Sequence, residues 1–211
     1  MPRPLIWLLI AAPAVMMIAF FTLMLTANND PVERRAGVRV SGEADIGGPF
    51  TLVDHTGTTV TDADFHGRAM LIYFGYTYCP DICPFSLQIM GAALDQLDPA
   101  ERARIQPVLI TVDPQRDTVE QLARYVTSPA FPDGLVGLTG TEEQIAEAAG
   151  AYRIVYRRAE TEEAGDYLMD HSSIVYLMDG EGEFVDIFTH GTDPQAMAAR
   201  LQDFLEEEGA S

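Results

Sequence analysis

Both cysteines of this chain lie where a short apolar run gives way to a helical pattern. Residues 69–75 read Ala-Met-Leu-Ile-Tyr-Phe-Gly, which is typical of a strand buried on both faces. Cys79 and Cys83 follow, and helical spacing of apolar residues begins at Phe85. If the helix begins near Cys79, both sulfur atoms project from one face, at the helix end where unpaired N–H groups favour thiolate.

This cysteine pair has several chemical interpretations. Two easily ionised sulfur atoms can exchange electrons as dithiol and disulfide, or hold a soft metal ion such as Cu(I). A structural disulfide enclosing only three residues would constrain the unfolded chain little and stabilise it little. The thioredoxin redox motif has two residues between its cysteines, whereas this motif has three. A structural zinc site needs four ligands, which the chain does not comfortably supply.

The order of elements predicts an α/β chain with a thioredoxin-like fold. Strand patterns alternate with helical patterns, and a further strand pair precedes a last helix that begins near Asp193. Alternating residues at 50–54 and 58–61 predict an additional N-terminal β-hairpin. The apolar runs on which this order rests are residues 69–75, 107–112, 135–139, 173–178 and 183–188.

The first 27 residues predict a single transmembrane helix. Residues 5–26 are apolar or nearly so, and as a helix they would extend ~33 Å across a bilayer whose hydrocarbon is ~30 Å thick. A cleaved signal peptide has a shorter apolar core, and residues 25–27 form a poor cleavage site. We therefore expect an anchor at 1–27, a polar tether at 28–47 and one domain at 48–211. The short amino terminus and the lack of an organellar presequence favour a bacterial inner membrane, with the domain in the periplasm.

The charge of the chain is strongly negative. Thirty-two acidic residues face thirteen arginines, and there is no lysine, which gives a net charge of −19. Such a charge opposes binding to nucleic acid or to anionic lipid, so neither is expected as a partner. An acidic, solubilised surface is the simplest interpretation.

Three motifs follow one another along the chain: FGYTYCPDICP at 74–84, VDPQRDT at 112–118 and DHSSIVYLMD at 170–179. Together they resemble the Sco/SenC family of membrane-anchored copper chaperones for cytochrome c oxidase assembly. The resemblance implies a thioredoxin-like fold that binds one copper ion through Cys79, Cys83 and His171. It also implies delivery of copper, received from a periplasmic donor, to the dinuclear CuA centre of cytochrome c oxidase subunit II.

The residues alone also favour His171 over the other histidines. It lies in a polar stretch directly before a buried strand, where a thioredoxin-like fold brings a loop against the cysteine-bearing helix. Two thiolates match Cu(I), and an added imidazole gives a set that also accepts Cu(II). His190 could approach the site only if its loop folded over it. His55 and His66 have no such position, and the methionines beyond the anchor fit core positions.

Two functions could use the same dithiol. A copper chaperone would bind one ion and pass it on without turnover, so no enzyme activity is expected. A thiol-disulfide oxidoreductase would instead reduce the CuA-site cysteines of the recipient so that they can take metal. Metal binding needs His171 and thiol exchange does not, so this residue separates the two hypotheses.

Overall fold

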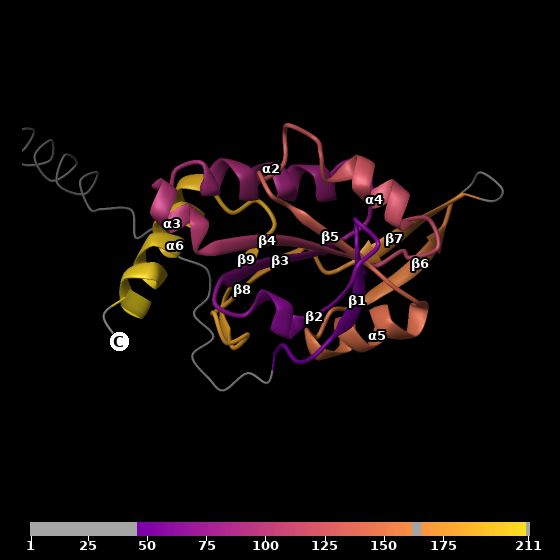
Figure 1. Cartoon of the computed structure of the whole chain (residues 1–211). Helices are drawn as coiled ribbons and strands as arrows, with labels where there is room; N and C mark the ends of the chain where they lie inside the picture. Colours follow the sequence, from indigo (N-terminus) through magenta and orange to yellow (C-terminus); the bar gives the residue numbers. More distant parts are fainter. Residues whose placement is uncertain (1–45, 162–165, 210–211) are drawn as a thin grey trace, which may run out of the picture. The chain divides into compact units, whose positions relative to one another are not determined.

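The computed structural model describes residues 46–161 and 166–209 of the chain (Figure 1). All of these residues belong to one compact unit, Gly37–Ser211. The expected anchor at 1–27 and nearly all of the expected tether at 28–47 lie outside the described residues, so both stay predictions. Within the described part, no helix combines the length and the apolar character needed to cross a bilayer.

A seven-stranded mixed sheet forms the centre of the domain, in the order β2-β1-β5-β4-β3-β8-β9. Strands β3, β4 and β5 are parallel, β8 is antiparallel to β3, and β1 and β2 form the predicted N-terminal hairpin beside β5. The strands of this sheet are β1 (Thr51–Asp54), β2 (Thr59–Thr61), β3 (Ala69–Gly75), β4 (Ile105–Thr111), β5 (Val136–Thr139), β8 (Ile174–Met178) and β9 (Phe184–Thr189).

Helices cover both faces of the sheet. In Figure 1, α2, α3 and α4 lie on one side of the strands and α5 lies on the other, while α6 packs against α2. The units β3-α2-β4 and β8-β9-α6 are the two halves of a thioredoxin-like fold, so the predicted α/β, thioredoxin-like domain is confirmed. The helices are η1 (Asp62–Phe65), α2 (Ile82–Leu94), α3 (Pro99–Ala103), α4 (Val119–Tyr125), α5 (Glu142–Ala151) and α6 (Pro194–Gly209).

The core explains why β3 and β4 are the central strands. All seven residues of each strand are buried, as expected for parallel strands with helices on both faces. Three aromatic rings join α5 to the sheet: the ring centroids of Phe74 and Tyr152 are 5.3 Å apart, and those of Tyr152 and Tyr176 are 5.7 Å apart. Each such buried side chain stabilises the fold by roughly 1.5–3 kcal/mol.

The largest departure from the sequence prediction is a second, two-stranded sheet. Strands β6 (Tyr156–Glu160) and β7 (Tyr167–His171) form an antiparallel hairpin that is separate from the main sheet. Figure 1 shows it extending past the end of the main strands. The expectation that His171 lies in a loop was wrong, because its backbone pairs with that of Tyr156 and makes it the last residue of β7.

A short helix was also missed. Asp98 caps α3 by accepting hydrogen bonds from the N–H groups of Ala100 and Glu101, each at 2.8 Å, and the carboxylate of Glu101 accepts the N–H of Asp98. This capping box, followed by a proline at the first helical position, is a signal that the sequence contains. The helix has only five residues, too few for a hydrophobic periodicity to show.

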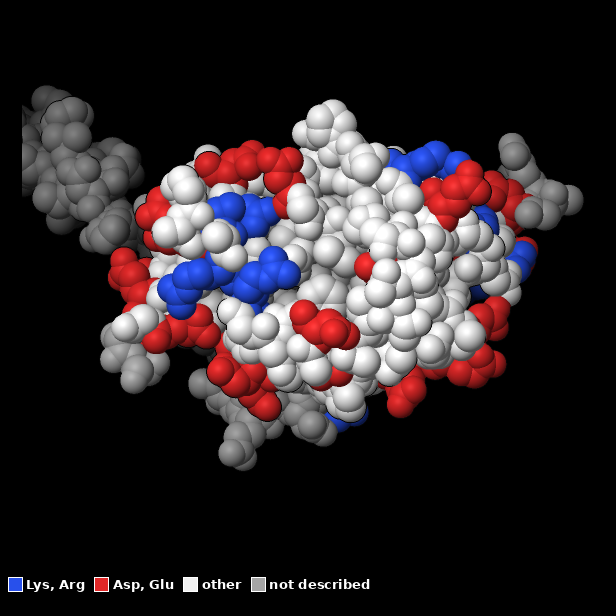
Figure 2. Space-filling model, viewed as in Figure 1, with Lys and Arg blue, Asp and Glu red and all other residues white. Residues whose placement is uncertain are grey.

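The charges are distributed unevenly over the surface. On the face shown in Figure 2, most acidic side chains lie near the edge, and some lie within the lower half of the face. One group of arginines lies on the side of α3 and α6, and a second lies near α4. A broad area with almost no charged side chains lies toward the middle of this face.

The domain is tightly packed around Gly75, the last residue of β3, close to the cysteines. A Cβ atom at Gly75 would lie 2.7 Å from Cε1 of Tyr73 and 3.1 Å from the sulfur of Cys83. Gly75→Ala should therefore lower the free energy of unfolding by about 1–3 kcal/mol, measured by denaturant titration.

Gly150→Ala is the matched control. Its Cβ would meet nothing within 4 Å, so replacing this glycine of α5 should raise stability by about 0.5–1 kcal/mol. An unchanged unfolding midpoint for Gly75→Ala would contradict the close packing of β3 against Cys83.

Candidate metal centre

The two cysteines lie at the junction between β3 and α2, one on each side of the start of the helix. The helix begins at Ile82, so the expectation that it starts near Cys79 was wrong. Cys79 precedes Pro80, and the proline ring disfavours helical geometry in the residue before it. The pair is nevertheless close, because the backbone N–H of Cys83 donates to the sulfur of Cys79 at 3.3 Å. Neither cysteine is in a disulfide; Cys83 is buried and Cys79 is partly exposed.

His171 brings a nitrogen atom to the same place from a position 88 residues further along the chain. Its Nε2 lies 3.4 Å from the sulfur of Cys83. Its other ring nitrogen, Nδ1, lies 3.2 Å from the carbonyl oxygen of Ser172. A carbonyl can only accept, so this contact places the proton on Nδ1 and leaves the lone pair of a neutral ring on Nε2.

Two tyrosine rings hold the imidazole in its orientation. Tyr73 and Tyr76 each meet the ring of His171 edge-on, with centroids 6.0 Å and 5.9 Å away. Burial raises the pKa of both tyrosines, that of Tyr76 to about 12, so neither carries charge beside the site. The sequence analysis did not single out either ring as a neighbour of His171. Their position at or directly after the end of β3, next to the cysteine segment, could have indicated that they lie beside the site.

The electrostatics of the pair are asymmetric. A hydrogen bond from the Cys83 thiol, with further bonds from backbone N–H groups, lowers the pKa of Cys79 to about 3 despite partial burial. Cys83 donates that bond and is buried, and both effects raise the pKa of its thiol. One thiolate and one thiol therefore stand side by side at neutral pH.

The donor set fits a soft metal ion. Thiolate and imidazole are ligands that copper accepts in both common oxidation states. A hollow of about 270 Å³ opens beside the site, lined among others by Cys79, His171 and Met169. Within residues 46–161 and 166–209, no three His, Cys, Asp or Glu side chains already form a metal-binding cluster. A bound ion would replace the contacts that now join Cys83 to His171 and to Cys79.

The other histidines have partners outside the cysteine pair. His190 packs its ring on that of Phe85, with centroids 5.6 Å apart. His55 accepts a hydrogen bond from the backbone N–H of Gly137, and His66 lies 3.9 Å from a carboxylate oxygen of Asp62. The sequence predicts core positions for the methionines. This prediction is confirmed for four of them, each at most 1% exposed: Met70, Met90, Met178 and Met197.

Asp81, between the cysteines, is placed to cap α2 but does not do so through its side chain. It is the N-cap residue of α2, but its side chain makes no capping hydrogen bond. The sulfur of Cys79 accepts from the helix end in its place. The carboxylate of Asp81 is exposed and lines the hollow beside Cys79.

Fold and site together define a thioredoxin-like domain that sets a dithiol against a histidine. Comparison with known proteins gives the family: the SCO1/SenC family model matches residues 38–206, and the chain belongs to this family. The human mitochondrial SCO1 homolog is 42% identical over 161 residues, which is 76% of this chain and 53% of the human protein. The chain spans about half the length of the curated relatives that it matches first.

Two solved structures of relatives were determined with copper bound. ScoI of Arabidopsis thaliana is 40% identical with a TM-score of 0.71, and the match covers 76% of this chain and 99% of that one. ScoI of Bradyrhizobium japonicum is also 40% identical, with a TM-score of 0.68 and coverage of 75% and 99%.

The asymmetry of the two thiols is open to a chemical test. Because the pKa of Cys79 is depressed, this residue stays thiolate as the pH falls and is protonated only near pH 3. Alkylation of Cys79 by iodoacetamide should therefore keep nearly the same rate from pH 8 to pH 5, with Cys83 unmodified, as located by mass spectrometry.

Cys83→Ala serves as the control for this titration. It removes the main donor to Cys79, so the alkylation rate should begin to fall at a higher pH than in the unaltered chain. A rate that falls about tenfold per pH unit below pH 8 in the unaltered chain would contradict the lowered pKa.

Proposed function

We propose that this chain is a membrane-anchored copper chaperone that binds one copper ion through Cys79, Cys83 and His171. The observation that carries the proposal is the 3.4 Å approach of the Cys83 sulfur to Nε2 of His171, beside the Cys79 sulfur at the start of α2. The copper-bound structures of two relatives support copper as the ion. The recipient, the CuA centre of cytochrome c oxidase subunit II, rests on the family resemblance of the three sequence motifs.

The ligand set suits an ion that must be received and passed on. Two thiolates hold Cu(I), and the imidazole supplies the nitrogen that Cu(II) prefers, so one set serves both states. His171 comes from the separate hairpin β6–β7, whereas both sulfur atoms come from the β3–α2 junction. The nitrogen ligand and the two sulfur ligands therefore belong to separate elements of the fold. Copper is cargo in this proposal, and the protein acts as an assembly factor without enzyme turnover.

The proposed location follows from the sequence. The apolar run at 5–26 would anchor the chain once in a bacterial inner membrane, and the tether would let the domain reach partners in the periplasm. A periplasmic copper donor and subunit II are the two partners required. The human relative is named as mitochondrial, and the Bradyrhizobium relative is bacterial.

A copper titration of the full chain in detergent tests the ligand set. One copper ion per chain should bind, and Cys79→Ala or Cys83→Ala should abolish binding, because a single thiolate cannot chelate. His171→Ala should weaken Cu(II) by at least about tenfold while Cu(I), held by two thiolates, changes far less. Sulfur-to-copper charge-transfer absorption reports the Cu(II) form.

His190→Ala is the matched control, because the ring of this histidine packs on Phe85 and not on either cysteine. It should bind both ions as the unaltered chain does. Unchanged Cu(II) absorption in His171→Ala would show that the third ligand lies elsewhere.

One observation favours a second function, thiol-disulfide exchange with the same recipient. A partly exposed thiolate, Cys79, stands in front of a buried thiol, Cys83, which is the order that exchange requires. Cys79 would attack a recipient disulfide and form a mixed disulfide. Cys83 would then pass its proton to the first recipient sulfur that was released and attack the sulfur of Cys79. The second recipient sulfur leaves and takes a proton from water, so the recipient is a dithiol and Cys79 and Cys83 are joined as a disulfide. The recipient gains two electrons and this chain loses two.

A genetic comparison separates the two functions. If the chain delivers copper, a strain lacking it should lose oxidase activity at low copper and regain much of it when copper is added. His171→Ala should then behave as the deletion does. If the chain reduces the recipient, Cys79→Ser should fail, His171→Ala should succeed, and a small thiol should restore activity where copper does not. Normal oxidase activity of the His171→Ala strain at low copper would refute copper delivery.

A further inference from the structure

One sequence motif, VDPQRDT at 112–118, has no role in the site described so far. It forms a tight turn directly after β4, in which the N–H groups of Arg116 and Asp117 donate to the carbonyl of Asp113 at 3.2 Å and 2.9 Å. Residue 112 is hydrogen bonded to the end of β3 through the carbonyl of Gly75. The turn therefore lies beside the segment that carries the cysteines.

The first arm of the turn reaches the cysteine segment. Asp117 is completely buried, and its carboxylate accepts the hydroxyl of Thr77 at 2.6 Å and the backbone N–H of Thr77 at 3.0 Å. The hydroxyl of Thr111, in β4, donates to the same carboxylate at 2.6 Å. Thr77 is two residues before Cys79, so the buried carboxylate ties the cysteine segment to the end of β4.

The second arm reaches the hairpin that carries His171. Arg116 donates through Nη1 to the carbonyl oxygen of Tyr167 at 3.0 Å, and Tyr167 is the first residue of the strand that ends at His171. The guanidinium carbon lies 3.6 Å from the centroid of the Tyr167 ring and 4.8 Å from that of Tyr78. Contacts of this kind between a guanidinium and aromatic faces are attractive.

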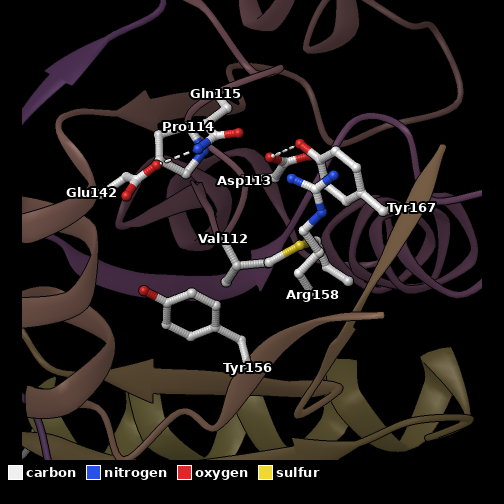
Figure 3. A pocket seen from close by; sticks show the side chains of 9 residues that line it. Val112, Asp113, Pro114, Gln115, Glu142, Tyr156, Arg158 and Tyr167 are labelled. Atoms are coloured by element: carbon white, nitrogen blue, oxygen red, sulfur yellow. Dashed lines mark hydrogen bonds between the residues drawn. The ribbon is translucent and has the colours of Figure 1, made fainter. Parts of the chain in front are cut away.

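Asp113 completes the second arm. Its carboxylate is 3% exposed; one oxygen accepts the hydroxyl of Tyr167 at 2.8 Å, and the other accepts Nε of Arg116. Figure 3 shows the bond between Asp113 and Tyr167 as a dashed line. The cation, the carboxylate and the tyrosine thus form one closed network between the turn and the hairpin.

The hairpin needs such a support because its own packing is incomplete. It shares no backbone ladder with the main sheet, and two-stranded hairpins are marginally stable alone. A cavity of about 220 Å³ is lined by Val112 and Glu142 of the body and by Tyr156 and Met169 of the hairpin. Figure 3 shows this cavity with Val112, Glu142 and Tyr156 labelled. Contacts at the turn therefore carry much of the attachment of β7.

We propose that Asp113, Arg116 and Asp117 are positioning residues that set the distance between the dithiol and His171. The turn acts as a two-armed brace: Asp117 fixes the cysteine segment, and Arg116 with Asp113 fixes the strand that presents the imidazole. This proposal rests on the proposed function of the site. It makes the two arms separable, since only the second arm touches the element that carries the nitrogen ligand.

The test of the second arm is the ratio of Cu(II) to Cu(I) affinity in the full chain. Arg116→Gln removes a charged donor, and Tyr167→Phe removes one hydroxyl with little change of shape. Arg116→Gln should lower Cu(II) affinity by about tenfold or more, with a shifted charge-transfer band, and leave Cu(I) affinity within about threefold. Tyr167→Phe should change the ratio in the same direction and by less.

Arg158→Gln is the matched control for the second arm. This arginine also lies on the Tyr167 ring, at 3.7 Å, but it pairs with Glu160 of its own strand. It should leave the affinity ratio within about twofold of the unaltered chain. If Arg158→Gln and Arg116→Gln change the ratio equally, general loosening of the hairpin explains the effect and the brace is wrong.

The first arm is tested at Thr77. Thr77→Val removes the hydroxyl that Asp117 accepts, and it should weaken Cu(I) and Cu(II) alike and shift the equilibrium of the Cys79–Cys83 disulfide with glutathione. Thr77→Ser keeps the hydroxyl and should therefore keep the copper affinities and the disulfide equilibrium of the unaltered chain. Asp98→Ala, which removes the cap of α3, lowers stability without a contact to the cysteine segment and should change neither affinity.

The outcomes distinguish this proposal from the function on which it rests. If the unaltered chain binds no copper, the proposed function fails, and the disulfide equilibrium of Thr77→Val still tests the first arm. If copper binds and Thr77→Val and Arg116→Gln match the unaltered chain in affinity, ratio and disulfide equilibrium, the brace is overturned.

Discussion

The first N–H groups of α2 need acceptors, and the site depends on how that need is met. The chain leaves a strand buried on both faces, turns at residues that include Pro80, and begins a helix whose capping carboxylate, Asp81, makes no capping bond. The sulfur of Cys79 accepts from the N–H of Cys83 instead. Helix ends favour negative charge, so this contact holds a thiolate at the surface and a second sulfur behind it.

The burial of Cys83 links this local contact to the rest of the fold. Its sulfur lies against Gly75, where a larger residue would collide with it, and it also lies beside the imidazole of His171. Burial disfavours charge on Cys83, whereas the hydrogen bonds favour charge on Cys79. The site therefore holds one proton between two sulfur atoms. A metal ion that takes both sulfur atoms must displace that proton, which couples its affinity to pH.

Much of the fold could be predicted because its signals are local. A thioredoxin-like order is indicated by the buried runs of β3 and β4 and by the strand pair before α6. The junction between β3 and α2 is indicated by Cys79 and Cys83 themselves. The hairpin β6–β7 was harder, because Arg157 and Arg158 of β6 are both exposed, so this strand does not alternate regularly between buried and exposed residues. The place of His171 on that hairpin depends on pairing with Tyr156, which is a long-range contact.

The contacts of the turn after β4 could not be predicted from the sequence at all. The motif at 112–118 was visible as part of a family resemblance, but Asp117 meets Thr77 across 40 residues and Arg116 meets Tyr167 across 51. Such contacts depend on how the strands are ordered in the sheet and not on residue spacing. A buried aspartate and an arginine among tyrosines become interpretable only after β4 and the hairpin are placed.

The central claim is that sulfur atoms from one element and a nitrogen atom from another form one metal centre. Copper K-edge X-ray absorption of the full chain, loaded with Cu(II), measures this set most directly. The account predicts two sulfur scatterers and one imidazole in the unaltered chain, and loss of the imidazole signal alone in His171→Ala. An imidazole signal that persists in His171→Ala, or a spectrum with no more than one sulfur atom, would contradict it.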